Sequence, residues 1–205
     1  MSVKRTTVYF EKPGKENTGE TLKIALEAAK EREIDTILVS STTGWTALVA
    51  INVFEGSGLR LIIVTHQTGY RDSGGQLMPK ETREKLLKAG AIVCTGTDVL
   101  TGGVEVGISR QRPAKTAPQE GRLPSIVPPV STIIAHTLRL FSQGVKVCVE
   151  IAMMAADGGL ISTDRPVVSV AGSHAGADTA MVITPSTSNR IRDLKIHEIL
   201  AKPLL

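Results

Sequence analysis

The feature that most constrains the fold is a regular alternation of short, β-branched apolar runs with segments of helical periodicity. Runs such as Ile37-Leu38-Val39 and Leu61-Ile62-Ile63-Val64 have the length and composition of strands buried on both faces. Between them, apolar residues recur every three or four positions, as on helices that pack against a sheet. This alternation predicts right-handed crossovers and a parallel sheet covered by helices on both faces.

The same pattern predicts where the elements lie. Strands are expected at residues 7–10, 35–39, 59–64, 91–94, 167–170 and 180–183. Helices are expected at residues 19–31, 46–55, 79–89, 130–141, 145–156 and 190–200. The last two strands are separated by a glycine-rich turn, and we expect them to add an antiparallel edge. The predicted fold is one α/β domain over residues 1–205, a three-layer sandwich with a mostly parallel sheet of about five to six strands.

Residues 107–129 interrupt the alternation with several prolines and arginines. A long insertion of this kind inside a compact domain is usually functional or disordered. One interpretation is a lid that brings Arg110 or Arg112 to an anion. The other is an arm that lies across a neighbouring copy, which fits an expected homo-oligomer.

Composition excludes several classes of protein. Hydrophobic residues make up 41% and charged residues 21% of the 205 residues, which is typical of globular proteins and too apolar for disorder throughout. The net charge is +4, and the basic residues are interspersed with acidic ones. We therefore expect no nucleic-acid partner, because such proteins usually carry a dense basic stripe. The most basic stretches are interpreted as a solvated loop and a solvated helix face: Arg110, Arg112, Lys115 and Arg122, and Arg190, Arg192 and Lys195.

The cellular compartment is predicted from apolar runs and cysteines. No run approaches the roughly 20 apolar residues of a membrane helix, and Met1–Arg5 does not resemble a secretory signal. Cys94 and Cys148 both lie within apolar runs, which predicts reduced core thiols. No paired His and Cys spacing indicates a structural zinc site. We expect a cytoplasmic protein with no membrane partner.

Small hydroxyls and glycines follow the predicted strands. The carboxyl ends of parallel strands meet at one edge of a sheet, where ligands bind. Ordinary connecting loops carry more Lys, Glu and Pro, so this edge is the predicted cofactor site. Its candidate residues are Ser40, Ser41, Thr42, Thr43, Gly44, Trp45, Thr46, Thr65, His66, Gln67, Thr95, Thr97, Gly172, Ser173, His174 and Asp178.

The segment from Ser40 to Thr46 is the sharpest of these loops, because it joins a predicted strand to a helix start. A helix start presents unpaired N–H groups and a partial positive charge, which suit a phosphate. The hydroxyls can donate to phosphate oxygens, and Gly44 lets the backbone approach closely. The loop has no Lys or Arg, which argues against a P-loop triphosphatase. One hydroxyl would suffice as a helix cap, so we expect a small phosphorylated ligand.

This loop resembles a known cofactor loop. Ser41-Thr42-Thr43-Gly44-Trp45-Thr46 is similar to the [ST]-x-T-G-x-T loop with which flavodoxin-type proteins hold the phosphate of FMN. The resemblance implies that FMN is the cofactor.

A broader resemblance covers residues 18–97 and resumes at 167–183. There the chain resembles the C-terminal α/β domain of pyruvate kinase, through Leu22…Ala25…Ala28, Ile37 to Gly44 and Ile63-Val64-Thr65. Stand-alone proteins of this type, common in archaea, are associated with FMN. In pyruvate kinase the matching Ser/Thr loop holds an effector phosphate, and a Gly-Trp-Arg-Pro-Gly hairpin makes a second contact. Gly172 to Gly176 lacks that Trp and Arg, and the catalytic barrel is missing, so neither sugar-bisphosphate binding nor kinase activity is implied.

Several polar and aromatic side chains near this edge have two interpretations. His66 and His174 are candidates for ligand binding or acid–base work, or are turn residues bonded to backbone. Asp178 is expected to orient His174 or to bind a ribityl hydroxyl, and Asp98 has the same options. His136 and His197 fall in predicted helices and are read as structural. Trp45 and Tyr70 either face a planar ring or pack on the sheet edge.

The function therefore has competing hypotheses. The first is a protein that binds FMN, with a redox reaction not identified by the sequence. The second is a non-catalytic regulatory module that senses a phosphorylated metabolite. The third is a purely structural oligomer. A Ser-His-Asp hydrolase is disfavoured, because Ser173, His174 and Asp178 are too close in sequence and no G-x-S-x-G elbow is present.

Overall fold

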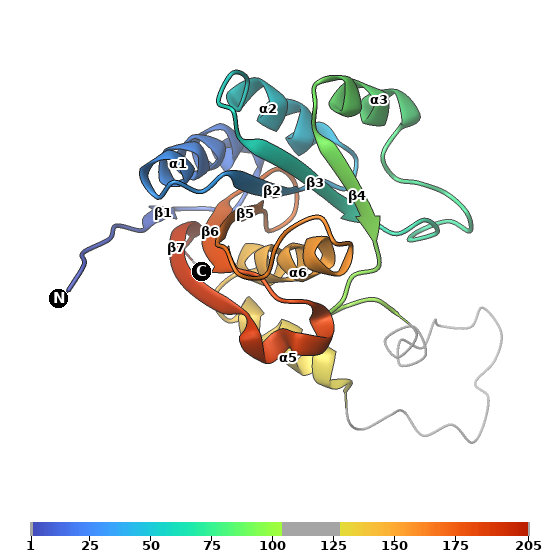
Figure 1. Cartoon of the computed structure of the whole chain (residues 1–205). Coiled ribbons are helices and arrows are strands. Elements are labelled where there is room, and N and C mark those ends of the chain that lie inside the picture. The colour runs from blue at the N-terminus through green and yellow to red at the C-terminus, as the bar shows by residue number, and fades with distance from the viewer. Residues whose placement is uncertain (1, 104–127, 205) are drawn as a thin grey trace.

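The computed structural model describes residues 2–103 and 128–204, and these form a seven-stranded sheet with helices on both faces (Figure 1). The strand order is β1-β7-β6-β5-β2-β3-β4. The strands are β1 (Val8–Phe10), β2 (Thr36–Ser40), β3 (Arg60–His66), β4 (Ile92–Gly96), β5 (Val167–Ala171), β6 (Thr179–Thr184) and β7 (Lys195–Pro203). The helices are α1 (Thr18–Glu31), α2 (Trp45–Val53), α3 (Lys80–Lys88), α5 (Val130–Arg139) and α6 (Gln143–Asp157), with short 3₁₀ turns η1 (Lys15–Asn17) and η2 (Ser188–Asp193).

The sheet separates two apolar cores, and alternate residues of its strands face each of them. Ile37 and Val39 pack with α1, α2 and α3, whereas Leu38 between them packs with α5 and α6. Both faces of the central strands are therefore covered, as parallel sheets require. The expected three-layer α/β arrangement is confirmed. The predicted sheet of about five to six strands is too small, since seven are observed.

The strands around β2 are parallel, and the order in which strands are added reverses next to β2. Strands β3 and β4 follow on one side of β2, and β5 then lies on its other side. The loops after β2 and β5 therefore flank a topological switch point, where ligands bind in open α/β sheets. Strands β5 and β6 are antiparallel, as expected, but the pair is not an edge because β7 and β1 lie beyond it.

The helix predicted at residues 190–200 is wrong. Residues Ser188–Asp193 form η2, and the chain then enters β7, which is antiparallel to β6 and parallel to β1. His197 lies on this strand rather than on a helix, and Thr184 Oγ1 is 2.8 Å from its Nε2. Apolar spacing in such a short segment fits either element, and pairing with two neighbours decides for the strand.

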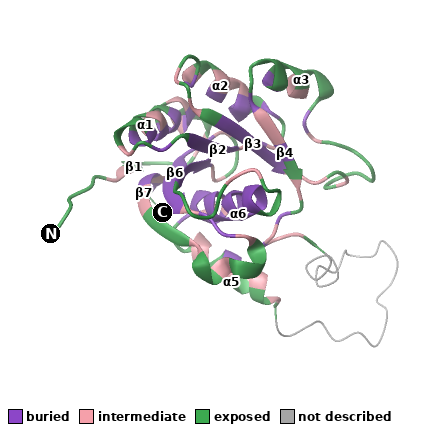
Figure 2. Cartoon of the chain, in the orientation of Figure 1, coloured by how far each residue is buried: buried purple, intermediate pink, exposed green. Residues whose placement is uncertain are grey.

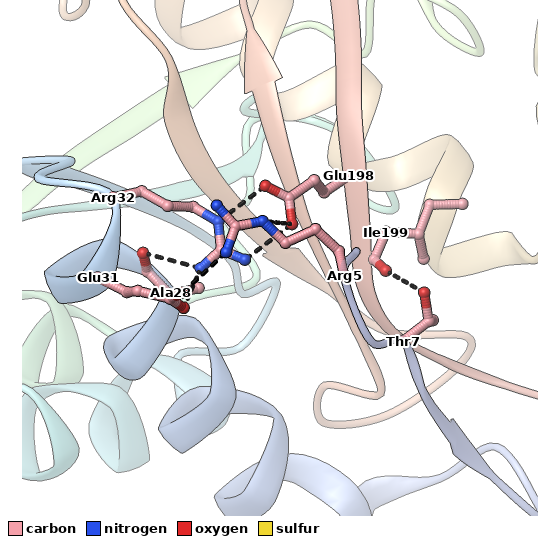
Figure 3. A network of polar contacts seen from close by, with 7 residues as sticks. All are labelled: Arg5, Thr7, Ala28, Glu31, Arg32, Glu198 and Ile199. Atoms are coloured by element: carbon pink, nitrogen blue, oxygen red, sulfur yellow. Dashed lines mark hydrogen bonds and ion pairs between the residues drawn. The ribbon is translucent and has the colours of Figure 1, made fainter. Parts of the chain in front are cut away.

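An ion pair fixes α1 against β7 (Figure 3). The guanidinium of Arg32, just past the end of α1, donates from Nε and Nη2 to the two carboxylate oxygens of Glu198, both at 2.8 Å. Arg5 and Glu31 extend the network at its exposed side. The hydrogen bond from Arg32 lowers the pKa of Glu198, and the same contact raises the pKa of Arg32.

Helix α6 is buried along almost its whole length, in contrast to the outward faces of α1, α3 and α5 (Figure 2). Its first turn is fixed by Ser142, whose hydroxyl accepts a hydrogen bond of 3.0 Å from the backbone N–H of Val145. Of the predicted insertion at 107–129, residues 107–127 lie outside the described residues, as do Arg110 and Arg112. Among the described residues, none of the helices has the length and apolar character needed to cross a membrane.

Candidate functional site

A cavity of about 540 Å³ opens at the carboxyl ends of the strands beside the switch point. Its walls come from the loop after β2, the end of β3, the loop after β5 and one side of α6. Its lining includes residues 40–43, 45–46, 64–66, 98, 101, 146, 150 and 172–176. The volume lies within the range of small-molecule sites. Most of the predicted cofactor residues therefore share one cavity.

The loop after β2 is shaped by Gly44. This glycine has φ of 94°, a left-handed conformation that disfavours other residues, and a Cβ there would lie 2.3 Å from Thr82 Cγ2. Gly44 lies behind the cavity wall and is not part of its lining. Helix α2 begins directly after it, with no acidic residue in its first turn to offset the partial positive charge.

The hydroxyls of this loop divide into two groups. Ser41 is buried, and its Oγ accepts a hydrogen bond of 3.2 Å from Ala47 N, so it caps α2. Thr42 and Thr43 line the cavity, and no intramolecular hydrogen bond of their hydroxyls is found in residues 2–103 and 128–204. Thr65 Oγ1 donates to the carbonyl of Thr42 at 3.2 Å and so ties the loop to β3. Loop hydroxyls thus remain available to a ligand.

The loop after β5 is braced by Asp178. The fully buried carboxylate of Asp178 accepts hydrogen bonds from Ser173 N at 3.1 Å and Thr179 Oγ1 at 2.9 Å. Asp178 does not line the cavity. Its carboxylate forms no hydrogen bond with His174, so it does not orient that histidine as suggested above. His174 is exposed and lies on the cavity wall.

His66 contacts two other side chains at the cavity, those of Asp98 and Tyr70. Its Nδ1 lies 2.8 Å from Oδ1 of the buried Asp98, and its ring stacks on Tyr70 at 4.0 Å between centroids. Both His66 and Asp98 line the cavity. Because Nδ1 is engaged with the carboxylate, Nε2 is the ring atom left for a ligand.

Besides Gly44 and Asp178, three more of the predicted residues are not part of the cavity lining: Gln67, Thr95 and Thr97. Thr95 Oγ1 instead accepts a hydrogen bond of 3.0 Å from Arg83 of α3, so it belongs to the contact between α3 and β4. Side chains alternate between the two faces of a strand, and that alternation turns Thr95 toward α3.

Sequence reasoning missed a buried ion pair in the cavity wall. Lys146 and Glu150, one turn apart on α6, are 2% and 3% exposed and form an ion pair. Burial lowers the pKa of Lys146, and the opposing effect of Glu150 is smaller. The signal was available, because these two are the only charged residues within the apolar run from Val145 to Ala156.

Trp45 and Tyr70, which either face a planar ring or pack on the sheet edge, each have a partner on one face of the ring. The ammonium of Lys15 lies 3.8 Å from the ring centroid of Trp45, and Tyr70 carries His66 on one face. Cation–π and stacking contacts of this kind favour ordered side chains. A ligand ring would have to use the other face of Tyr70 or displace Lys15.

The cavity therefore combines a hydroxyl-rich helix start, a histidine–aspartate pair and a buried lysine. In the part of the chain that the structure describes, no group of three or more His, Cys, Asp or Glu residues could hold a metal ion. A search of the chain against models of known protein families finds no match.

Proposed function

We propose that this protein binds a small molecule through a phosphate ester held at residues 40–46, with FMN as the first ligand to test. The observation that carries the proposal is that the hydroxyl-bearing loop at the start of α2, including Thr42 and Thr43, lines a cavity of about 540 Å³. Backbone N–H groups at a helix start bind phosphate without a nearby cation. The resemblance of residues 41–46 to the flavodoxin-type loop makes FMN the leading candidate.

The fold itself supports a second part of this proposal. We infer that the domain is of the pyruvate kinase C-terminal type, on the resemblance over residues 18–97 and 167–183. In that family the same loop binds a phosphate, which agrees with the proposed site.

The test uses the single tryptophan of the chain as a reporter. Trp45 lines the cavity, so FMN bound there should quench its fluorescence. The purified, untagged protein is first examined for a flavin absorption spectrum and then titrated with FMN. Thr43→Val should weaken binding about tenfold, the value of a hydrogen bond to a charged group. Thr137→Val, on α5, is the matched control and should bind normally.

A sensor of a phosphorylated metabolite is the second candidate, and a specific observation favours it. Trp45 and Tyr70 each have one ring face occupied, by Lys15 and by His66, and charged side chains such as Asp98 and Glu150 contribute to the cavity lining. Such a lining suits the hydroxyls and carbonyls of a small polar molecule. Thermal stabilisation by phosphorylated sugars with none by FMN would select this candidate. Stabilisation by neither class would contradict both.

A further inference from the structure

The buried lysine of the cavity is held in a defined position. Lys146 Nζ donates to Thr101 Oγ1 at 2.8 Å and to the carboxylate of Glu150. Glu150 Oε1 in turn accepts from the backbone N–H of Leu100 at 2.9 Å and of Thr101 at 3.1 Å. The ammonium and its carboxylate are therefore fixed against the loop after β4, on the wall of the cavity.

Stability does not account for this arrangement. A buried ion pair gains little over an apolar pair of similar size, because both charges lose their hydration. Here the pair interrupts an otherwise apolar helix, and it faces a cavity instead of the packed core. Burial also lowers the pKa of Lys146, which increases the share of the neutral, nucleophilic amine.

We propose that Lys146 is a carbonyl-reactive amine that forms an imine with a phosphorylated aldehyde or ketone bound in the cavity. This inference rests on the phosphate site proposed at residues 40–46, which would hold the other end of the same molecule. Lys146 and the loop hydroxyls line one cavity, so a single small ligand can contact both.

The step requires only water and protons. The Lys146 ammonium gives one proton to the Glu150 carboxylate, and the nitrogen lone pair then attacks the carbonyl carbon. A C–N bond forms as the C=O π bond opens, and the carbonyl oxygen takes a second proton from the nitrogen to become a hydroxyl. Glu150 returns its proton to that hydroxyl, which leaves as water while the C=N bond forms. The third proton of the original ammonium passes from the nitrogen to solvent. No oxidant or reductant is consumed.

Pyridoxal 5′-phosphate is a suitable probe, because it joins an aldehyde to a phosphate ester. The full chain is incubated with it, reduced with borohydride and analysed by intact mass and peptide mapping. We expect one adduct per chain, at Lys146. It should form about tenfold faster than the adduct of unphosphorylated pyridoxal at the same concentration, because the phosphate adds binding free energy that corresponds to about tenfold in affinity. Inorganic phosphate should slow the reaction.

Two lysine variants separate this site from general lysine reactivity. Lys146→Arg keeps the cation beside Glu150 and should abolish the adduct. Lys88→Arg changes an exposed lysine at the end of α3, outside the cavity lining, and should leave the adduct at Lys146. If Lys146→Arg unfolds, Lys146→Met combined with Glu150→Leu removes both charges together and tests the same loss.

The outcomes distinguish the two inferences. Adducts spread over surface lysines, or an unchanged adduct in Lys146→Arg, overturn the assignment of Lys146. Quenching of Trp45 by pyridoxal phosphate without an adduct also overturns it, but leaves the phosphate site intact. Equal labelling of Lys146 by pyridoxal and its phosphate would support the amine and contradict the phosphate site.

Discussion

His66 Nδ1 lies 2.8 Å from Asp98 Oδ1, and this contact joins the ends of the parallel strands β3 and β4 at the mouth of the cavity. Asp98 is 6% exposed, so its carboxylate depends on this partner. The loop that carries Asp98 also supplies the N–H groups that bind Glu150. One loop therefore orients both the histidine and the buried ion pair.

Removing His66 should destabilise the protein more than removing an exposed surface residue would. In His66→Ala the buried carboxylate of Asp98 loses its hydrogen bond to the His66 ring, at a cost of about 2–3 kcal/mol. His174→Ala removes an exposed histidine of the same cavity and should change stability by less than about 0.5 kcal/mol. Urea unfolding measures both. Equal effects of the two variants would contradict a structural His66–Asp98 pair.

Substitution of Gly44 should disturb the loop and its stability together. Gly44→Ala places a methyl group against Thr82 in a left-handed backbone conformation, and should cost about 2–3 kcal/mol. Gly56→Ala is the control, since Gly56 has φ of 68° but nothing within 4 Å of an added Cβ. It should cost only about 1 kcal/mol. Thermal or urea unfolding that ranks the two variants equally would refute the steric explanation.

The Arg32–Glu198 pair predicts an acid-dependent part of the stability. The folded-state pKa of Glu198 is lowered, so its contribution is complete above the ordinary glutamate pKa and disappears as the pH falls through the folded value. Glu198→Gln should be less stable than wild type by about 1–2 kcal/mol at neutral pH. That difference should shrink below about pH 4.3.

The measurement is urea unfolding of wild type and Glu198→Gln between neutral and acid pH. Glu84→Gln changes an exposed carboxylate of α3 and should show little difference at any pH. A Glu198→Gln deficit that stays constant down to pH 3 would mean that the ion pair is not its source.

The thiols should be unreactive in the folded protein. Burial raises the pKa of both Cys94 and Cys148, so little thiolate forms at neutral pH. Cys148 also donates to the carbonyl of Ser169 at 3.3 Å, within the core. A colorimetric thiol reagent should modify both cysteines in denaturant and neither in native buffer. Fast modification of Cys148 in the native protein would show that α6 opens locally.

The sequence predicted the central part of the fold well. Strands β2, β3 and β4 are apolar on both faces and end in polar loops, so both their type and their common edge follow from local pattern. The order of the strands and the place of β7 depend on contacts between distant segments. The apolar spacing of residues 190–200 fits a helix as well as a strand, and pairing with β6 and β1 decides it.

The candidate site was predicted in part for the same reason. Loop residues such as Thr42 and His66 follow strands directly, so their common edge is implied by the parallel pattern. Lys146 lies on α6, and its position at the cavity depends on how this helix packs against the sheet. The sequence feature that marks Lys146 is the charged pair that it forms with Glu150 inside an otherwise apolar helix.

The pairing of β1 with β7 joins residues near the two ends of this sequence, which are synthesised far apart in time. Val8 lies beside Ala201, and among the described strands β1 pairs with β7 alone. On the ribosome, β1 must therefore wait for nearly the whole of this sequence before its backbone finds a partner. Among the described strands, β1 pairs with the one that is synthesised last, and a nascent chain that has not reached Lys195 lacks that partner.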